Sequence, residues 1–210
     1  MNKKLYWDIL DQKRKDILPL LSAFKQDFYL AGGTALALQL GHRDSIDFDF
    51  FSPKSFSTEI LFQKIQKIFV SHSIVKTQEE KDTLTVEIDS SIKISFFIYP
   101  YELIKPLIDE ENFRIAAISD IGAMKLSAIT SRSILKDYVD LYFILHQIEL
   151  GELLNLTKEK FPSIDANPIL KSLVYFDDIR EEPILFKHND DVSFKIVKKY
   201  LVALIRDYLS

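Results

Sequence analysis

The spacing of apolar residues changes along this 210-residue chain, near Pro100 and Pro106. Before this point, short β-branched and aromatic runs recur, and residues 45–51 alternate strictly between polar and apolar side chains. After it, Ala, Leu and Ile recur at the helical period of about 3.6 residues. The pattern predicts an α+β fold. Residues 1–118 are expected to form an α/β core, in which residues 28–118 form a mixed β-sheet with helices on one side and the 45–51 strand near its centre. Residues 119–210 are expected to form a helical lobe.

The same patterns place the individual elements. The expected strands cover residues 28–31, 45–51, 73–77, 83–88 and 92–99, with 113–118 as a final candidate. The expected helices cover residues 8–24, 35–40, 58–69, 120–130, 133–146, 152–160, 168–176 and 192–209. Pro19 is expected to kink or split the first helix, and Thr34 is the expected N-cap of the second.

Composition excludes several classes of protein. The chain has no cysteine, so it has neither disulfides nor a thiolate nucleophile, and a cytoplasmic setting is the default expectation. With 27 basic and 31 acidic residues the net charge is -4, so a nucleic acid would have to be held by a local patch. No apolar run reaches the roughly 18 to 20 residues of a membrane helix, and the first residues lack an apolar signal segment. No membrane partner is therefore expected.

Two carboxylates carry the clearest chemical signal. Asp47 and Asp49 are two apart in the expected 45–51 strand, so they project from the same face and repel each other unless a cation lies between them. Mg²⁺ (or Mn²⁺) suits such oxygen ligands and leaves positions for phosphates. Upstream, Gly32 and Gly33 precede a short helix, where backbone N–H groups can approach phosphates closely. Together these features predict a site for a nucleoside triphosphate and its metal, and attack on phosphorus.

Longer strings surround these residues. The first is Gly32-Gly33-Thr34-Ala35-Leu36, followed by His42-Arg43-x-Ser45-x-Asp47-x-Asp49-x-Phe51. The second is Asp120-Ile121-x-Ala123-x-Lys125-Leu126-x-Ala128-Ile129, followed by Arg132 and Lys136-Asp137-x-x-Asp140-Leu141. Over roughly residues 28–146 the chain resembles the AbiEii/AbiGii-type toxin nucleotidyltransferases, within the DNA-polymerase-β-like superfamily. The resemblance implies a nucleotidyltransferase-like core and an enzyme that moves NMP from an NTP to a tRNA or protein acceptor. It further implies a toxin countered by an antitoxin.

The resemblance also implies a role for each matched residue. Asp47 and Asp49 hold the metal, and Gly32 and Gly33 cradle the phosphates. Lys125 completes the nucleotide site with Asp137 or Asp140, which share a helix face and cannot be separated by spacing. Thr34 and Ser45, which belong to the first string, are included among the nucleotide-binding residues.

One position departs from the superfamily. A third carboxylate, the usual general base, is expected in the 94–97 run, where this chain has Ser95. Glu87 or Asp89 on the partner strand is a possible substitute, because a three-residue turn would bring Glu87 to the face of Ser95 and a two-residue turn would not. The absence of this carboxylate keeps an alternative open, a degenerate transferase that works as a nucleotide-binding sensor or scaffold. A metal-dependent phosphohydrolase is less favoured, because the chain has no paired His-Asp pattern.

Two neighbours of the first string are open to interpretation. Arg43 is either a surface residue that closes the preceding helix or a contact to phosphate or RNA. His42 and the other three histidines have no ligand-spaced partners and are interpreted as structural.

Overall fold

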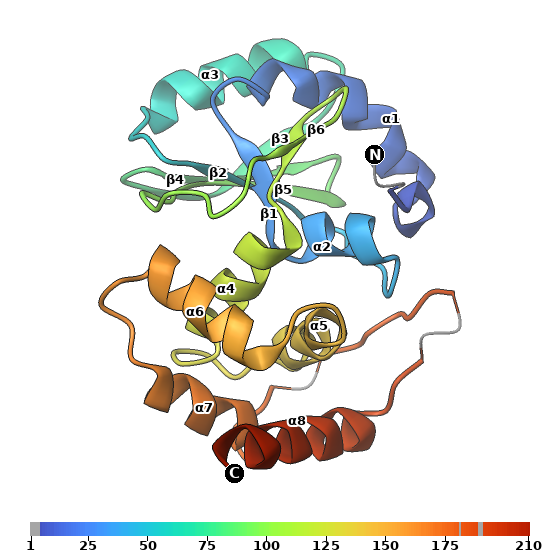
Figure 1. Ribbon diagram of the computed structural model, residues 1–210. Helices are drawn as coiled ribbons and strands as arrows, with labels where there is room; N and C mark the ends of the chain where they lie inside the picture. Colours follow the sequence, from blue (N-terminus) through green and yellow to red (C-terminus); the bar gives the residue numbers. More distant parts are fainter. Residues whose placement is uncertain (1–4, 181, 189–190) are drawn as a thin grey trace.

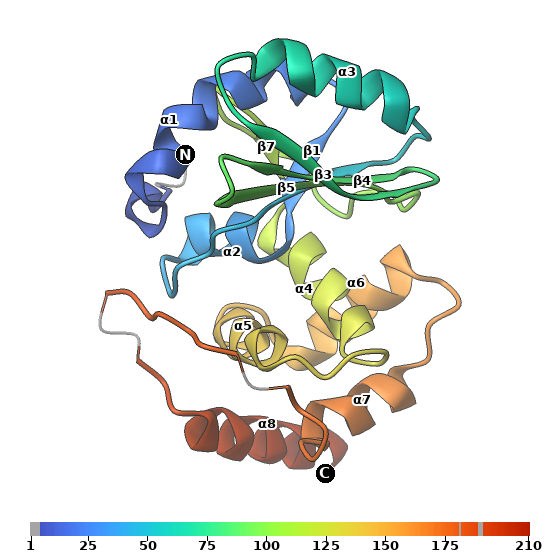
Figure 2. The same cartoon turned by 180° about the vertical axis from the view of Figure 1, so that it is seen from behind.

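The computed structural model describes residues 5–180, 182–188 and 191–210, and the lysine-containing start at residues 1–4 lies outside these ranges. In the described residues, seven strands form one mixed sheet in the order β3-β4-β5-β2-β1-β7-β6 (Figures 1 and 2). The strands are β1 Tyr29–Ala31, β2 Phe48–Ser52, β3 Ile74–Glu80, β4 Thr83–Ile88, β5 Ile92–Ile98, β6 Ile108–Asp109 and β7 Arg114–Ile115. The α-helices are α1 Gln12–Leu21, α2 Gly32–Leu40, α3 Thr58–Ile68, α4 Ile118–Ala128, α5 Leu135–Leu145, α6 Leu150–Lys160, α7 Ala166–Val174 and α8 Phe194–Leu209.

The predicted α+β architecture is confirmed, with β2 in the middle of the sheet. β2 pairs antiparallel with β1 and parallel with β5. It begins at Phe48, three residues later than expected, because the preceding carbonyls accept hydrogen bonds from side chains. Arg14 Nε donates to the carbonyl of Ile46 at 2.7 Å, and Thr34 donates to that of Asp47. Ile46, an apolar residue of the expected 45–51 strand, lies before β2 and is 56% exposed.

Helices cover both faces of the sheet. Figures 1 and 2 show α1 and α3 over one face, and α2 and α4 at the other. The expectation that helices lie on one side is therefore wrong. The reason is that β1 runs directly into α2 without a loop, which places this helix against the face opposite α3.

The first expected helix is divided as Pro19 suggested. Short 3-10 turns at Trp7–Ile9 and Ser22–Phe24 flank α1, which contains Pro19 and ends two residues after it. Asp11 caps the start of α1, since its carboxylate accepts a hydrogen bond from the backbone N–H of Arg14 at 2.9 Å.

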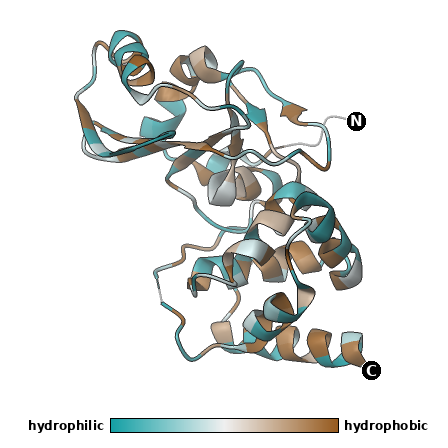
Figure 3. Cartoon of the chain, turned by 90° about the vertical axis from the view of Figure 1, so that its left-hand side faces the viewer, coloured by the Kyte–Doolittle hydropathy of each residue, from teal (hydrophilic) through white to brown (hydrophobic). Residues whose placement is uncertain are grey.

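The second half is helical, as the change of period predicts. One cluster of buried hydrophobic residues runs from the sheet into α4–α8, and Figure 3 shows hydrophobic positions in both halves. The division at residues 118/119 stays a prediction. No helix in the described ranges is long and apolar enough to cross a bilayer.

Candidate functional site

A cavity of about 650 Å³ lies beside the start of α2, the first half of β2 and α4. Its wall includes Gly32, Gly33 and Ser45, together with five acidic and five basic residues. These are Asp44, Asp47, Asp49, Asp137 and Glu182, and Arg43, Lys93, Lys125, Arg132 and Lys136. The structure thus gathers in one place most of the residues predicted from two strings that are far apart in the sequence.

Neighbouring side chains approach both glycines too closely for a Cβ atom, and Gly32 also has a positive φ. Gly32 has a φ of +70°, and a Cβ atom there would lie 3.1 Å from Asp49 Oδ2. A Cβ atom on Gly33 would lie 2.8 Å from Arg43 Nη2. Any side chain at either position would therefore displace a charged group of the site.

Asp47 and Asp49 lie in the cavity wall, and no lysine, arginine or histidine among the described residues forms an ion pair with either of them. Asp49 stands on β2 directly between Ala31 of β1 and Ser95 of β5, and Asp47 immediately precedes this strand. Burial, and secondarily the charge of Asp47, raises the pKa of Asp49. Lys93, Lys125 and Arg132 act on Asp49 from a distance but do not offset its burial. Two close carboxylates without a direct ion pair fit a divalent cation, which prefers oxygen ligands. No group of three or more His, Asp or Glu residues suited to a metal occurs in the described ranges, so this pair would leave the remaining coordination positions to water or phosphate.

Thr34 has a different position from the one expected. The N-cap of α2 is Ala31, and Thr34 is the third residue of the helix. Thr34 is 1% exposed, its hydroxyl donates to the carbonyl of Asp47, and the Ser45 hydroxyl oxygen lies 2.8 Å from Thr34 Oγ1. Thr34 is not in the cavity wall, so it holds the approach to β2 in place instead of facing the cavity.

Lys125 and Asp137 form the opposite wall. Lys125, on α4, lies 2.7 Å from Asp137 Oδ1 and 2.7 Å from Asp140 Oδ2, both on α5. The other oxygen of Asp137 accepts a hydrogen bond from Arg132 Nε at 2.9 Å. The ammonium group of Lys125 is thus fixed between two carboxylates at the edge of the cavity.

Asp140 lies behind this wall and is fully buried. Arg43 binds it in bidentate fashion, with Nε 2.7 Å from Oδ1 and Nη2 2.7 Å from Oδ2, and His42 Nε2 lies 2.8 Å from Oδ1. Burial alone would raise the pKa of Asp140, but Arg43 and Lys125 outweigh it and hold this pKa well below its usual value. Burial also lowers the pKa of His42, so a neutral ring donates to the carboxylate.

These contacts revise the interpretation of the residues involved. Arg43 is not a surface residue, and although it reaches the cavity wall its guanidinium is committed to Asp140. His42 is structural, as predicted. Spacing alone left Asp137 and Asp140 equivalent, whereas the structure places Asp137 in the wall and Asp140 behind it. Arg43 belongs to the first sequence string and Asp140 to the second. Nothing in the sequence, however, indicated that Arg43 pairs with a residue 97 positions away.

Ser95 stands where the third carboxylate was expected, next to Asp49 on the neighbouring strand. Its hydroxyl lies 3.3 Å from Thr85 Oγ1. The β4–β5 connection has three residues, so Glu87 shares the face of Ser95 but lies opposite Lys93, outside the cavity wall. Asp89 lies in the turn, where it bonds to His72 Nδ1 at 2.7 Å. Neither acid takes the place of a carboxylate at Ser95.

A segment between α7 and α8 completes the cavity wall. Glu182, Pro183 and Leu185 line it. The carbonyl of Leu185 accepts a hydrogen bond from the N–H of Asp44 at 2.8 Å, and the N–H of Lys187 donates to the carbonyl of His42 at 3.0 Å. No sequence motif indicated that this part of the chain reaches the site.

Comparison with known proteins agrees with this geometry. Residues 19–196 match the model of the nucleotidyl transferase AbiEii toxin family, of type IV toxin-antitoxin systems. An uncharacterized protein of Aquifex aeolicus (strain VF5) is 44% identical over 193 residues, which cover 87% of this chain and 88% of that protein.

Two solved structures share the fold. The first is MenT4, a nucleotidyltransferase toxin from Mycobacterium tuberculosis H37Rv, with a TM-score of 0.60 and 16% identity over 93% of this chain and 82% of that one. The second is JHP933 from Helicobacter pylori, with a TM-score of 0.58 and 20% identity over 96% and 92%. The chain belongs to the AbiEii nucleotidyltransferase toxin family, as its motifs predicted.

Proposed function

We propose that this member of the AbiEii family transfers a nucleoside monophosphate from an NTP to an RNA acceptor, such as tRNA, or to a protein hydroxyl. Asp47 and Asp49 would hold Mg²⁺ or Mn²⁺, and Gly32, Gly33 and Lys125 would hold the phosphates. The observation that carries the proposal is that two carboxylates without a direct ion pair, a helix start with two glycines and a fixed lysine line one cavity.

Each wall of the cavity supplies one requirement of the reaction. The first N–H groups of α2 have no acceptor within the helix and point toward the end occupied by Gly32 and Gly33, where they favour phosphate oxygens. Lys125 faces them as a fixed positive charge. When bound, the metal ion supplies further charge neutralisation for the phosphates.

The transfer reaction needs no reactant other than the NTP and the acceptor hydroxyl. The acceptor hydroxyl oxygen forms a bond with the α-phosphorus, and the bond from that phosphorus to the bridging oxygen of pyrophosphate breaks. The hydroxyl proton leaves to solvent, because Ser95 is a weak base and no carboxylate stands in its place. Rate enhancement then depends on positioning and on neutralising the negative charge that builds up on the phosphates.

The direct test is to incubate the purified chain with each labelled NTP, Mg²⁺ or Mn²⁺, and total tRNA or cell extract. We expect label on RNA or on a protein band from one or two NTPs, and none with Asp49→Asn. The exposed-surface variant Asp109→Asn is the matched control and should label like the original chain, because Asp109 pairs with Lys25 far from the cavity. Labelling that persists in Asp49→Asn would contradict the assignment of the metal ligands.

A second candidate function is supported by Ser95. A chain without the third carboxylate would bind an NTP and its metal but turn over slowly, as a sensor or scaffold. Calorimetry that shows NTP binding with no labelled acceptor would favour this function. Ser95→Asp then separates the two, since a carboxylate beside Asp49 should raise labelling only if the missing base limits the reaction.

The biological partner is part of the same proposal. Membership in a family of type IV toxins supports an antitoxin that counters this chain, and a cytoplasmic location, where NTPs and tRNA are present. Expression of the chain should slow growth, and co-expression of the adjacent reading frame should restore it. Growth inhibition by Asp49→Asn equal to that by the original chain would show that toxicity does not come from transfer.

A further inference from the structure

Asp47 and Asp49 are held in place by different means. Asp49 lies within β2, where Ala31 of β1 and Ser95 of β5 are its partners in the sheet. Asp47 precedes this strand, because the pairing of β2 with β5 begins at Phe48. The backbone that carries the Asp47 carboxylate therefore depends on support from outside the sheet.

Two side chains supply this support, one on each side of the Asp47 α-carbon. The Ile46 carbonyl, which precedes it, accepts a hydrogen bond from Arg14 Nε at 2.7 Å. The Asp47 carbonyl, which follows it, accepts one from the hydroxyl of Thr34. Both donors are buried, with exposed fractions of 5% for Arg14 and 1% for Thr34. The peptide groups before and after Asp47 are thus fixed by side chains of α1 and α2.

Arg14 is itself held by two further contacts. Its Nη1 contacts the carboxylate of Asp11, which also caps α1. Its Nη2 donates to the carbonyl of Ser91, in the β4–β5 turn, at 2.7 Å. The planar guanidinium therefore connects α1, the approach to β2 and the β4–β5 turn through donors in a fixed geometry. A lysine in its place would keep the charge but would have a single nitrogen for these acceptors.

The charge of Arg14 does not explain its place beside the site. Arg14 is paired with Asp11, whereas the cations that act on Asp49 are Lys93, Lys125 and Arg132. Arg14 consequently acts on the acidic pair through the position of the backbone.

We propose that Arg14 is a positioning residue for the metal ligand Asp47. By holding the Ile46 carbonyl, it keeps the Asp47 carboxylate beside Asp49 in the cavity wall, where both can bind one divalent cation. The inference rests on the proposed function in one respect, the assignment of Asp47 and Asp49 as metal ligands. Replacing an outer residue that orients a metal ligand typically lowers metal affinity by about 10–100-fold.

The test measures binding of Mn²⁺ to the full chain by water-proton relaxation, with no NTP and no turnover. Arg14→Lys keeps the positive charge but cannot donate to both carbonyls, so Mn²⁺ affinity should fall by roughly tenfold or more. Asp11→Asn keeps an acceptor at the N-cap of α1 but removes the carboxylate that orients Arg14, and should cause a smaller loss. If Arg14→Lys does not fold, Asp11→Asn decides the question.

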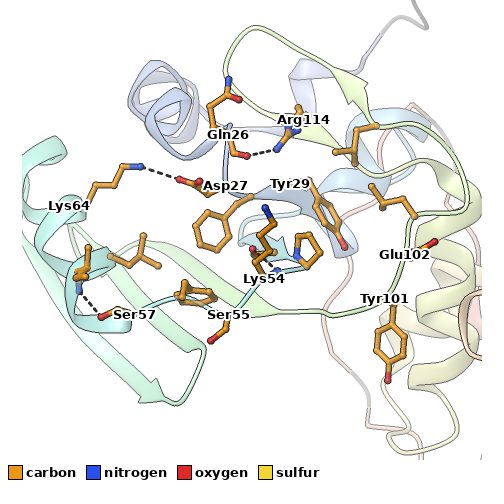
Figure 4. Close-up of a pocket in the computed structure, with 18 residues that line it drawn as sticks. Gln26, Asp27, Tyr29, Lys54, Ser55, Ser57, Lys64, Tyr101, Glu102 and Arg114 are labelled. Carbon is orange, nitrogen blue, oxygen red and sulfur yellow. Dashed lines mark hydrogen bonds and ion pairs between the residues drawn. The ribbon is translucent and has the colours of Figure 1, made fainter.

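Arg114 provides the matched control. Its Nη2 donates to the backbone carbonyl of Gln26 at 2.8 Å, in the wall of a second cavity of about 750 Å³ (Figure 4). The two cavities share no lining residue. Arg114→Lys should therefore leave Mn²⁺ affinity unchanged, even where thermal melts in EDTA show a loss of stability equal to that of Arg14→Lys.

The outcomes separate this inference from the proposed function. If the original chain does not bind Mn²⁺, the metal site is wrong and both proposals fall. If the original chain binds Mn²⁺ and both Arg14→Lys and Asp11→Asn bind it equally well, only the positioning role is overturned. Equal losses of affinity in Arg14→Lys and Arg114→Lys would also overturn that role, since they would show an effect of general destabilisation.

Discussion

Two pairs of aspartates, Asp47 with Asp49 and Asp137 with Asp140, lie in or directly behind the wall of the cavity beside α2 and α4, and they are in opposite electrostatic states. Asp137 and Asp140 accept hydrogen bonds or ion pairs from Lys125, Arg132, Arg43 and His42. Within the described residues Asp47 and Asp49 make no direct ion pair, and the pKa of Asp49 is raised where that of Asp140 is lowered. The chain thus pairs one set of acids directly with cations, whereas Lys93, Lys125 and Arg132 act on Asp49 only from a distance and do not offset its burial.

The comparison separates two roles that the sequence cannot distinguish. Both pairs are short acidic motifs, with the acids two residues apart in one and three in the other. A buried carboxylate surrounded by cations is part of the framework, because removing one partner leaves the other charges uncompensated. A carboxylate pair without cations destabilises the empty fold and gains its favourable interaction only with a bound cation.

The largest effect is expected for the uncompensated pair. Asp47→Asn and Asp49→Asn should each lower metal-dependent transfer by about 10³-fold or more, roughly 4 kcal/mol of transition-state stabilisation. Both variants should unfold at the same or a higher temperature without metal, because a repulsion is removed. Transfer assays and thermal melts in EDTA measure the two effects. A clear drop in melting temperature for Asp49→Asn would break the comparison, since it would show that Asp49 supports the fold.

The compensated pair should behave in the opposite way. Asp140→Asn should lower the free energy of unfolding by about 3 kcal/mol, because Arg43 and Lys125 lose their shared counter-charge in a buried site. Denaturant unfolding gives the value. Asp109→Asn, in an exposed pair with Lys25, is the control and should change it by less than about 1 kcal/mol. Equal effects in the two variants would refute a structural role for Asp140.

Lys125 forms ion pairs with Asp137 and Asp140 and lines the same cavity as Asp47 and Asp49, so its replacement tests both pairs. Lys125→Ala should lower transfer by about 10²-fold, because a charge near the phosphates is lost in a poorly hydrated site. NTP binding should fall less than turnover. The fold should lose less stability than in Asp140→Asn, since Arg132 still neutralises Asp137 and Arg43 still binds Asp140. Lys76→Ala, in a surface pair with Glu79, is the matched control. Unchanged binding and transfer in Lys125→Ala would remove this lysine from the site.

The smallest effect is a difference in pH dependence. The raised pKa of Asp49 means that its charge opposes folding at neutral pH. Without metal, this penalty should therefore fade as the pH drops through the raised pKa toward the ordinary value of 3.8. The advantage of Asp49→Asn in stability should shrink over that range. The lowered pKa of Asp140 acts in the other direction, and its contribution should be lost only as the pH falls below 3.8. Unfolding of both variants between about pH 7 and pH 4 measures this. Parallel curves would contradict the opposite shifts.

The sequence predicted those elements and site residues that depend on the local pattern of side chains. The helices from α3 onward and the hairpin strands follow from apolar periodicity, and Gly32, Gly33, Asp47 and Asp49 lie within one short stretch. The bidentate contact of Arg43 with Asp140 spans 97 residues, so no local pattern marks Arg43 as buried. For the same reason Thr34 appeared to be an N-cap, since its contact with the Asp47 carbonyl depends on where β2 lies relative to α2.

The partners of His42 and Arg43 also determine when the site can form as the chain is synthesised. A ribosome releases the N-terminal strands and α2 well before residue 140, and the contact between Asp44 and Leu185 cannot form until residue 185 has been added. Until then the two basic side chains have no buried carboxylate to bind. The loop that leads to Asp47 is consequently among the last parts of the sheet region to settle. We expect chains that end before residue 140 to be inactive in transfer, because Arg43 and His42 then lack the carboxylate that holds them beside the cavity.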